Sequence, residues 1–327
     1  MNFLVVPTNR PERLLEFLDA WDPWPWDRIL VIEDAAEVTL ELPADRWESD
    51  LATVETYSWK EIDAELPEPW IISRMDSGIR AFGFWKAWRD GAGCVFTIDD
   101  DCQPSGDDIV AGHLRNLHET PMWQTSVPGL RVRGLPYRNF GEPLCVDVSV
   151  GLWLGCPDID SVQSLGQEAN QTNDLPVLAV DTRVMPSEQY FPMSGMNLAV
   201  RREAACLMYY PPMGRESPYA RFDDIWCGLV VQRICRHLRR SIVCGRPFVE
   251  HRRASDPLVN LVKEAPGIGA NERMWELVEA VELRGATPVD CMREVGDGLV
   301  ASASDEDYVE RWGRAILAWC ELFGNGR

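Results

Sequence analysis

The sequence predicts an α/β fold in which a sheet is flanked by helices and followed by a helical extension. Three short apolar runs, beginning at residues 3, 29 and 94, are separated by two segments with helical patterns. Strands and helices that alternate in this way are typical of a sheet with right-handed crossover connections. Roughly the last sixty residues carry only helical patterns, so we expect them to pack as helices on the sheet domain.

The first two predicted strands end in polar loops. Residues 3–6 are apolar and lead into a loop with two prolines, which suits the start of a helix. Leu14, Leu18 and Trp21 then recur at helical spacing. Residues 29–32 form the second apolar run and are followed directly by acidic side chains. Ligands of open α/β sheets bind outside the carboxyl ends of the strands, so these loops are candidate ligand positions.

A second helix is expected before the third strand. Ser73 precedes a helical pattern, and Asp76 occupies the capping-box position three residues later. Ile79, Phe82 and Trp85 continue the pattern toward the third apolar run. We therefore expect this helix to begin directly after Ser73.

The rest of the chain is predicted more coarsely. Residues 104–192 are rich in Pro, Gly and Asn, so we expect loops there with a few strands, such as residues 148–154. Helical periodicity returns after Asp223 and again after about Asn271. No internal repeat or low-complexity tract is present.

Composition excludes several classes of protein. Asp and Glu outnumber Lys and Arg by 52 to 32, and the net charge of −20 repels phosphate backbones, so we expect no nucleic-acid partner. The N-terminal apolar run is only strand-length and lacks a preceding basic segment, which predicts neither a signal peptide nor an integral membrane segment. Ten scattered cysteines without a CxxC pair indicate buried thiols in a reducing cytoplasm.

Three adjacent carboxylates follow the third apolar run, in the segment CVFTIDDDC (94–102). Side chains alternate along an extended segment, so Asp99 and Asp101 would share one face and Asp100 the other. Two carboxylates beyond a strand end can hold Mg²⁺ or Mn²⁺, whose other ligands are water and phosphate oxygens. The cation would let a net-negative protein bind a diphosphate. The alternatives are a solvated acidic loop and, less favoured for three neighbours, glycosidase-type acid/base work.

Several segments together resemble one known family. They are VVPTNR (5–10), SRMDSGIRAFGFW (73–85), FTIDDDC (96–102), VSVGLWL (148–154), FPMSGMNLA (191–199), RFDDIW (221–226) and HRRASDPLVNLVKE (251–264). The chain resembles, from about residue 3 to residue 264, the reversibly glycosylated polypeptides. These are the UDP-arabinopyranose mutases, best known from plants.

The resemblance implies a glycosyltransferase-A-like, nucleotide-sugar-binding mixed sheet for residues 1–265, with a C-terminal helical extension over residues 266–327. It implies a cytoplasmic mutase that depends on Mn²⁺ or Mg²⁺ and interconverts the pyranose and furanose forms of a UDP-sugar. Its partner would be a UDP-sugar, and a homo- or hetero-oligomer is compatible with it. Two other functions stay open: a glycosyltransferase with an external acceptor, and a non-catalytic subunit of a mutase complex.

The resemblance also assigns roles to individual residues. Asp99 and Asp101 match the metal-binding acids, and His251 matches a histidine that can complete the metal or diphosphate site in similar folds. Asp223 and Asp224 resemble the sugar-binding acids and are candidate catalytic residues, although carboxylates are favoured at a helix start by the helix dipole alone. The candidate substrate-binding residues are Pro7, Thr8, Arg10, Asp34, Asp76, Arg80, Asp100, Arg133, Gly195 and Asn197.

An arginine loop is the last feature that the resemblance implies. The family carries a glycosylated arginine shortly after an Arg-Gly-x-Pro segment, and RGLPYRNFGEP (133–143) supplies Arg133 and Arg138 here. Arg138 is the candidate for the modified, catalytic arginine. Its pKa above about 12 means that a nearby carboxylate must take its proton if it becomes covalently attached. Clamping of phosphate by either arginine is the alternative.

Overall fold

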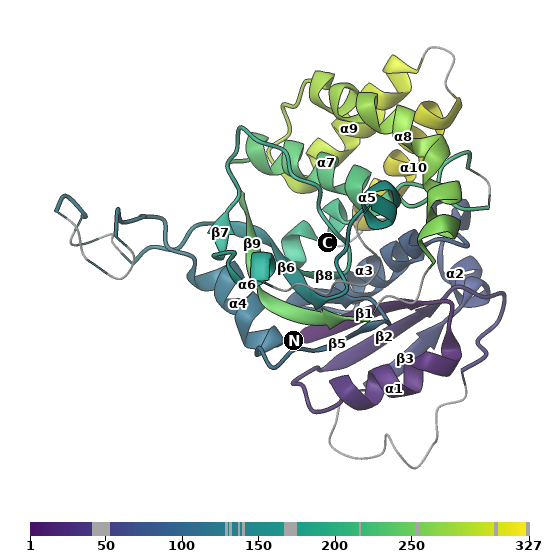
Figure 1. The fold of residues 1–327 in the computed structure, drawn as a ribbon. Helices are drawn as coiled ribbons and strands as arrows, with labels where there is room; N and C mark the ends of the chain where they lie inside the picture. The colour runs from purple at the N-terminus through teal and green to yellow at the C-terminus, as the bar shows by residue number, and fades with distance from the viewer. Residues whose placement is uncertain are drawn as a thin grey trace.

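The computed structural model describes residues 1–40, 53–127, 130, 133–136, 138, 141–166, 175–215, 217–252, 256–303 and 307–324. In these residues a single mixed sheet of nine strands is covered by helices on both faces (Figure 1). This confirms the predicted α/β class, and it is the architecture expected of a glycosyltransferase-A-like fold with C-terminal helices.

Four parallel strands form one half of the sheet. β1 (Asn2–Thr8) pairs on one side with β2 (Arg28–Glu33), which in turn pairs with β3 (Thr53–Tyr57). On its other side β1 pairs with β4 (Cys94–Ile98). The carboxyl ends of these strands therefore lie at one edge, where polar loops can meet.

The other half of the sheet contains mostly antiparallel pairs. β8 (Asn197–Arg201) lies antiparallel to both β4 and β6 (Val146–Gly155). β9 (Ser241–His251) pairs in parallel with β6, while β5 (Cys102–Pro104) and β7 (Arg183–Val184) run antiparallel to β9. Only residues 99–101 separate the end of β4 from the start of β5, which pairs with β9.

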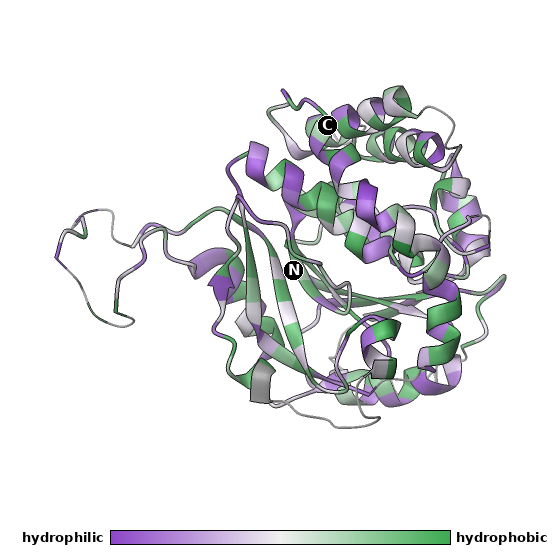
Figure 2. Cartoon of the chain, turned by 45° about the horizontal axis from the view of Figure 1, so that its top comes forward, coloured by the Kyte–Doolittle hydropathy of each residue, from purple (hydrophilic) through white to green (hydrophobic). Residues whose placement is uncertain are grey.

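Alternate residues of the sheet enter two hydrophobic cores. Phe3 and Val5 of β1 face one core, and Leu4 and Val6 face the other, as side chains on a pleated strand must. Figure 2 shows hydrophobic residues concentrated along these central strands. The first core is covered by α3 (Arg80–Arg89), α7 (Asp223–His237), α8 (Pro257–Ala280), α9 (Pro288–Ser302) and α10 (Asp307–Gly324), and the second by α1 (Pro11–Trp21) and α4 (Ile109–Glu119).

Short elements complete the described chain. They are α2 (Trp59–Glu65), α5 (Ser161–Gly166), α6 (Leu175–Leu178) and the 3₁₀ turns η1 (Pro69–Ile71), η2 (Ser77–Ile79) and η3 (Arg202–Leu207). None of the helices within the described residues has the length and apolar character needed to cross a membrane. The ten cysteines, all of them described, are free and seven are buried, which confirms the prediction of buried thiols.

The start of α3 differs from the prediction. The hydroxyl of Ser73 donates to the carbonyl of Met213 at 3.1 Å and accepts from its N–H at 3.0 Å, so Ser73 caps no helix. Asp76 is the cap instead, because its carboxylate accepts from the N–H of Gly78 at 2.9 Å at the start of η2. The α-helix itself begins at Arg80. Ser73, which the local pattern assigned to the helix cap, is instead used in a tertiary contact with Met213.

The helix expected after about Asn271 begins much earlier. α8 runs over Pro257–Ala280 and is capped by the carboxylate of Asp256. Pro266 lies inside it and removes a backbone donor, which interrupts the sequence pattern without ending the helix. The predicted boundary between residues 265 and 266 therefore falls within α8, and the division into two domains stays a prediction.

A segment between α4 and β6 leaves the body of the protein. Pro121 and Pro143 form an isolated bridge, and the N–H of Met122 donates to the carbonyl of Glu142 at 3.0 Å. Beyond this stem, the described residues project away from the sheet (Figures 1 and 2). We call residues 121–143 the arm.

Candidate active site

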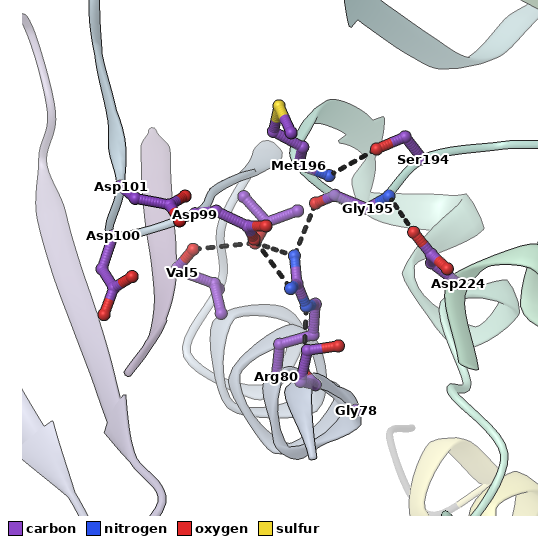
Figure 3. Close-up of polar contacts among 12 residues, drawn as sticks. Val5, Gly78, Arg80, Asp99, Asp100, Asp101, Ser194, Gly195, Met196 and Asp224 are labelled. Atoms are coloured by element: carbon purple, nitrogen blue, oxygen red, sulfur yellow. Dashed lines mark hydrogen bonds and ion pairs between the residues drawn. The ribbon is translucent and has the colours of Figure 1, made fainter. Parts of the chain in front are cut away.

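The carboxylates of Asp99, Asp100 and Asp101, the strand-end acids, follow β4 at the edge where the parallel strands end. Figure 3 shows the carboxylate of Asp100 pointing away from those of Asp99 and Asp101. Asp100 and Asp101 lie in a turn, closed by the N–H of Cys102 donating to the carbonyl of Asp99 at 3.0 Å, so the division comes from this turn and not from the extended segment that was expected. Its members have different partners.

Asp100 is held by the last residue of β1 and by the residue that precedes α1. The hydroxyl of Thr8 donates to its carboxylate at 2.6 Å, and the guanidinium of Arg10 bonds both carboxylate oxygens. Burial raises the pKa of Asp100, and the neighbouring Arg10 opposes this rise. The side chain of Arg10 keeps 29% of its surface exposed. Asp100 therefore orients the partly exposed guanidinium of Arg10, which can bind a phosphate. We call the surface around Arg10 the mouth of the site.

Asp99 is paired with a buried arginine. Arg80 Nη2 lies 2.7 Å from Asp99 Oδ1, and the Arg80 side chain is 3% exposed. The same guanidinium donates to the carbonyl of Ser77 at 3.0 Å and to the carbonyl of Gly195. Burial works against the charge of Arg80, but Asp99 and other carboxylates keep its pKa above the ordinary value. Arg80 thus stays charged and fixes the first strand-end acid.

Asp101 faces a histidine brought in by the sheet. β5 and β9 pair Cys102 with His251, and this places His251 Nε2 3.7 Å from Asp101 Oδ1. His251 Nδ1 lies 2.8 Å from the carbonyl of Cys156, which can only accept, so Nδ1 carries a proton. In the neutral ring, Nε2 then presents a lone pair to the carboxylate across a distance too long for a hydrogen bond.

This donor set fits a divalent cation. A carboxylate oxygen and an imidazole lone pair that face one another are both acceptors, and Mn²⁺ and Mg²⁺ accept such ligands. Within the described ranges, no group of three or more His, Cys, Asp or Glu side chains is close enough to hold a metal by itself. A cation here would therefore complete its shell with water and with phosphate oxygens of a ligand.

Asp224 lies across Arg80 from the strand-end acids (Figure 3), and Asp76 and Asp223 are close enough for the charges of the three carboxylates to influence one another. Asp223 and Asp224 open α7, as predicted. The hydroxyl of Ser77 donates to Asp223 at 2.7 Å, and the N–H of Gly195 donates to Asp224 at 2.8 Å. Burial, with the nearby Asp223, raises the pKa of Asp224 to about 8. We call Asp76, Asp223 and Asp224 the inner acids.

Three predicted substrate-binding residues have other roles in the structure. Asp34 accepts from Trp59 Nε1 at 2.7 Å and from the N–H groups of Met75 and Asp76 at 3.0 and 2.9 Å, so it orients the loop of the inner acids. Asn197 is buried and bonds His113 at 2.9 Å and the carbonyl of Pro247 at 3.0 Å. Pro7 is a buried residue of β1. The structure shows these contacts within the protein, and the substrate contacts predicted for the three residues stay predictions.

The two predicted arginines are not brought to the carboxylates. Arg133 and Arg138 are exposed residues of the arm, which projects from the body (Figure 1). The structure thus separates the arginine loop from the strand-end acids and from the inner acids. Their predicted roles stay predictions.

Three residues of this region were missed from the sequence. Asp158 accepts from the hydroxyl of Ser194 at 2.7 Å and contributes to the raised pKa of Asp224. Tyr210 and Tyr308 lie close enough to Asp223 for its charge to help raise their pKa values, after the larger effect of burial. Helical periodicity marks Tyr308 only as a core residue, and no local motif surrounds the other two.

Comparison with known proteins adds independent information. A sequence model of the family described as "Reversibly glycosylated polypeptide" matches residues 3–326. "UDP-arabinopyranose mutase 1" of Arabidopsis thaliana is 33% identical over 98% of this chain and 91% of the plant protein. "Probable UDP-arabinopyranose mutase 1" of Zea mays is 35% identical over 98% and 89%. "UDP-arabinopyranose mutase 1" of Oryza sativa subsp. japonica is 36% identical over 81% and 73%.

Proposed function

The chain belongs to the reversibly glycosylated polypeptide family, and from this premise we propose that it is a mutase that interconverts the pyranose and furanose forms of a UDP-sugar. UDP-arabinose is the substrate we propose, because the similar plant proteins are named UDP-arabinopyranose mutases. We also propose that the reaction depends on Mn²⁺ or Mg²⁺. The observation that carries this dependence is the pair of facing acceptors, Asp101 and His251, beside the cation Arg10.

Different residues of the chain would bind the phosphates of UDP and the metal ion. Arg10 is kept at the mouth by Asp100 and can donate to phosphate oxygens. Arg80 fixes Asp99, while the carbonyl of Cys156 fixes the His251 ring, so two of the three proposed metal ligands are oriented in advance. A bound divalent cation would stabilise UDP as a leaving group. The net charge of −20 otherwise opposes a diphosphate, so the site needs these local cations.

The decisive experiment incubates the pure protein with UDP-arabinopyranose and Mn²⁺ and resolves the pyranose and furanose products by chromatography. We expect soluble UDP-arabinofuranose, and no product after chelation of the metal. Transfer of the sugar to an added acceptor would instead show a glycosyltransferase. Binding of UDP without turnover would show a non-catalytic subunit.

Self-glycosylation of Arg138 is a separate part of the proposal. The bond between the anomeric carbon and UDP would break with the electron pair going to UDP, a bond to a guanidinium nitrogen would form, and a carboxylate would take the proton. Arg138 is exposed on the arm, so its guanidinium is open to modification. Peptide mass spectrometry after incubation should find a pentose on Arg138 and none in Arg138→Ala. Arg133→Ala, which alters the other described arginine of the arm, is the matched control. Undiminished labelling of Arg138→Ala would refute the assignment.

Location and assembly complete the proposal. We place the protein in the cytoplasm, because its free and mostly buried cysteines suit a reducing compartment. Light scattering on the purified protein tests whether it forms the proposed homo-oligomer, and co-purification with related chains tests a hetero-oligomer.

A further inference from the structure

The proposed isomerisation requires movement of a proton, and the inference below rests on that proposed function. In an aldopentose, the bond from C1 to the ring oxygen O5 is exchanged for a bond from C1 to O4. The electron pair of the broken bond stays on O5, which gains a proton, and O4 loses its proton when it bonds C1. UDP leaves C1 and later bonds to it again, so these two steps make no net change in bonds or protons. The site therefore needs a group that accepts one proton and donates one.

The inner acids are placed to be such a group. Asp76 accepts from the backbone N–H groups of Gly78, at 2.9 Å, and of Arg221. Asp223 and Asp224 accept from a hydroxyl and from a backbone N–H, respectively. All of these donors are neutral, and the nearby buried cation, Arg80, is already paired with Asp99. Asp223 is buried and Asp76 and Asp224 are half-buried, so three carboxylates with so little positive charge beside them favour a shared proton over full ionisation.

The electrostatic surroundings agree with this geometry. Burial raises the pKa of Asp76, and the charge of Asp223 raises it further. Asp158 adds a further negative charge beside Asp224, whereas Arg80 opposes it. The two tyrosines that face these acids, on the segment before α7 and on α10, are themselves kept protonated by burial. The region therefore holds protons at neutral pH.

A separate observation points to a ligand. Tyr210 and Tyr308 are 0% and 7% exposed, and their hydroxyls have no hydrogen-bond partner within the described part of the chain. Trp312 Nε1, one helical turn after Tyr308, is also buried without a partner there. A buried polar group without a hydrogen-bond partner destabilises the folded protein. The hydroxyl groups of a bound sugar would supply the missing hydrogen-bond partners of these side chains and would also bond the neighbouring carboxylates.

Backbone strain marks the same place. Met75 has a φ of 60° and Arg221 a φ of 66°, both in the left-handed region that non-glycine residues rarely adopt. Met75 directly precedes Asp76, and the N–H that Arg221 presents in this conformation is one of the donors to Asp76. Strain of this kind clusters at functional sites, although Arg239, in the turn after α7, also has a φ of 55°.

We propose that Asp76, Asp223 and Asp224 form an acid–base unit with a shared proton, and that the Tyr308 hydroxyl bonds the same sugar. The unit takes the proton of O4 as the C1–O4 bond forms and supplies a proton to O5 as the C1–O5 bond breaks. Its own proton content is the same before and after turnover. Tyr308 makes the C-terminal helix α10 part of the substrate site.

The first test replaces each inner acid by the isosteric amide, in Asp76→Asn, Asp223→Asn and Asp224→Asn. An amide cannot relay the proton, so we expect kcat to fall by about 10²- to 10⁴-fold in at least Asp223→Asn and Asp224→Asn. The affinity for UDP with Mn²⁺, measured by calorimetry, should stay unchanged because UDP is held on the other side of Arg80. Wild-type kcat in all three variants would overturn the inference.

Infrared spectroscopy separates this inference from the proposed function. A protonated carboxyl has a carbonyl band that a carboxylate lacks, so the wild-type protein at neutral pH should show the band and Asp224→Asn should show less of it. Absence of the band in the wild type overturns the shared proton whatever the activity. A wild type that shows the band but isomerises no UDP-arabinose overturns the proposed function instead. Asp147→Asn, which alters a buried carboxylate paired with Arg240, is the control.

Two buried tyrosines, Tyr308 in α10 and Tyr209 in the segment before α7, test the role of α10. Tyr209 donates its hydroxyl to the carbonyl of Ile71 at 2.7 Å, so Tyr209→Phe should lower the midpoint of urea unfolding and leave the kinetics unchanged. Tyr308→Phe removes a hydroxyl without a described partner, so stability should not fall, while KM should rise about tenfold. Unchanged KM together with lower stability in Tyr308→Phe would show a merely structural hydroxyl.

Discussion

The strand-end acids and the inner acids use the same side chain in opposite electrostatic surroundings. Asp99 and Asp100 each contact an arginine, and Asp101 faces Arg10 and His251 at the mouth of the site. The inner acids bond neutral hydroxyl and backbone donors, and burial raises the pKa values of Asp76 and Asp224. One set is therefore suited to bind cations and the other to hold protons.

Arg80 is the structural reason for this division. Its guanidinium pairs with Asp99 and also donates to the carbonyl of Gly195, whose N–H bonds Asp224. One buried cation thus separates two negative groups that would otherwise repel each other. Asp99 is neutralised directly by Arg80, whereas the inner acids reduce their mutual repulsion by holding a proton.

The largest expected effect follows from removal of this cation. Arg80→Met leaves Asp99 without its partner beside the inner acids. Loss of one partner of a buried ion pair typically destabilises by about 3–5 kcal/mol, and we expect the lower end here because the Asp99 side chain is 30% exposed. We expect a decrease of that size in the free energy of unfolding, measured by urea denaturation. Arg314→Met, which breaks an exposed pair with Glu310 on α10, should change stability by less than about 1 kcal/mol. Equal effects of the two variants would contradict the role given to Arg80.

The next effect concerns the strand-end acids alone. Asp101→Asn removes the carboxylate that faces His251, so we expect kcat to fall by roughly 10²- to 10³-fold. The Mn²⁺ concentration that gives half of the remaining activity should also rise, which loss of an inner acid would not cause. Asp297→Asn, an exposed change on α9, is the control. Full activity of Asp101→Asn in the presence of a chelator would remove the metal from the proposal.

The inner acids should give stability an unusual dependence on pH. Asp224 has an ordinary pKa of 3.8 and a pKa of about 8 in the folded protein, so between these values the folded state binds a proton that the unfolded state lacks. Stability from this group is complete below about pH 4 and is lost as the pH rises through about 8, at about 1.4 kcal/mol per pH unit within the window. Asp224→Asn removes this loss, so its stability relative to the wild type should increase with pH. Urea unfolding at several pH values measures it, and parallel curves would contradict the raised pKa.

The sequence revealed the strand-end acids and not the inner acids as a group, for a physical reason. Asp99, Asp100 and Asp101 are adjacent, and the apolar run before them predicts the strand that places them. Asp76 and Asp223 are 147 residues apart in the chain, and only the packing of α7 against η2 brings them together. Tyr308 has the periodicity of a core residue, so its missing partner becomes visible only in three dimensions.

The fold shows the same contrast between local and tertiary signals. β1, β2, β4 and β6 were predicted because their residues are apolar runs of strand length. The first half of α8 was missed because its buried face carries Asn260, Glu264 and Gly267, whereas Leu258 and Val262 are exposed. Glu264 is buried because it bonds Arg221 and the N–H of Ser161. Contacts with other segments therefore determine which face of this helix is inside.

The smallest expected effect would sharpen the comparison at the mouth of the site. Arg10 bonds both oxygens of Asp100 and lies 3.4 Å from Asp101, a geometry that a lysine cannot reproduce with its single nitrogen. Arg10→Lys keeps the charge, so we expect kcat to be retained while KM for the UDP-sugar rises about tenfold, or 1.4 kcal/mol. Arg314→Lys is the control at an exposed pair. An unchanged KM would mean that charge alone, and not the forked geometry of the guanidinium, holds the diphosphate beside the strand-end acids.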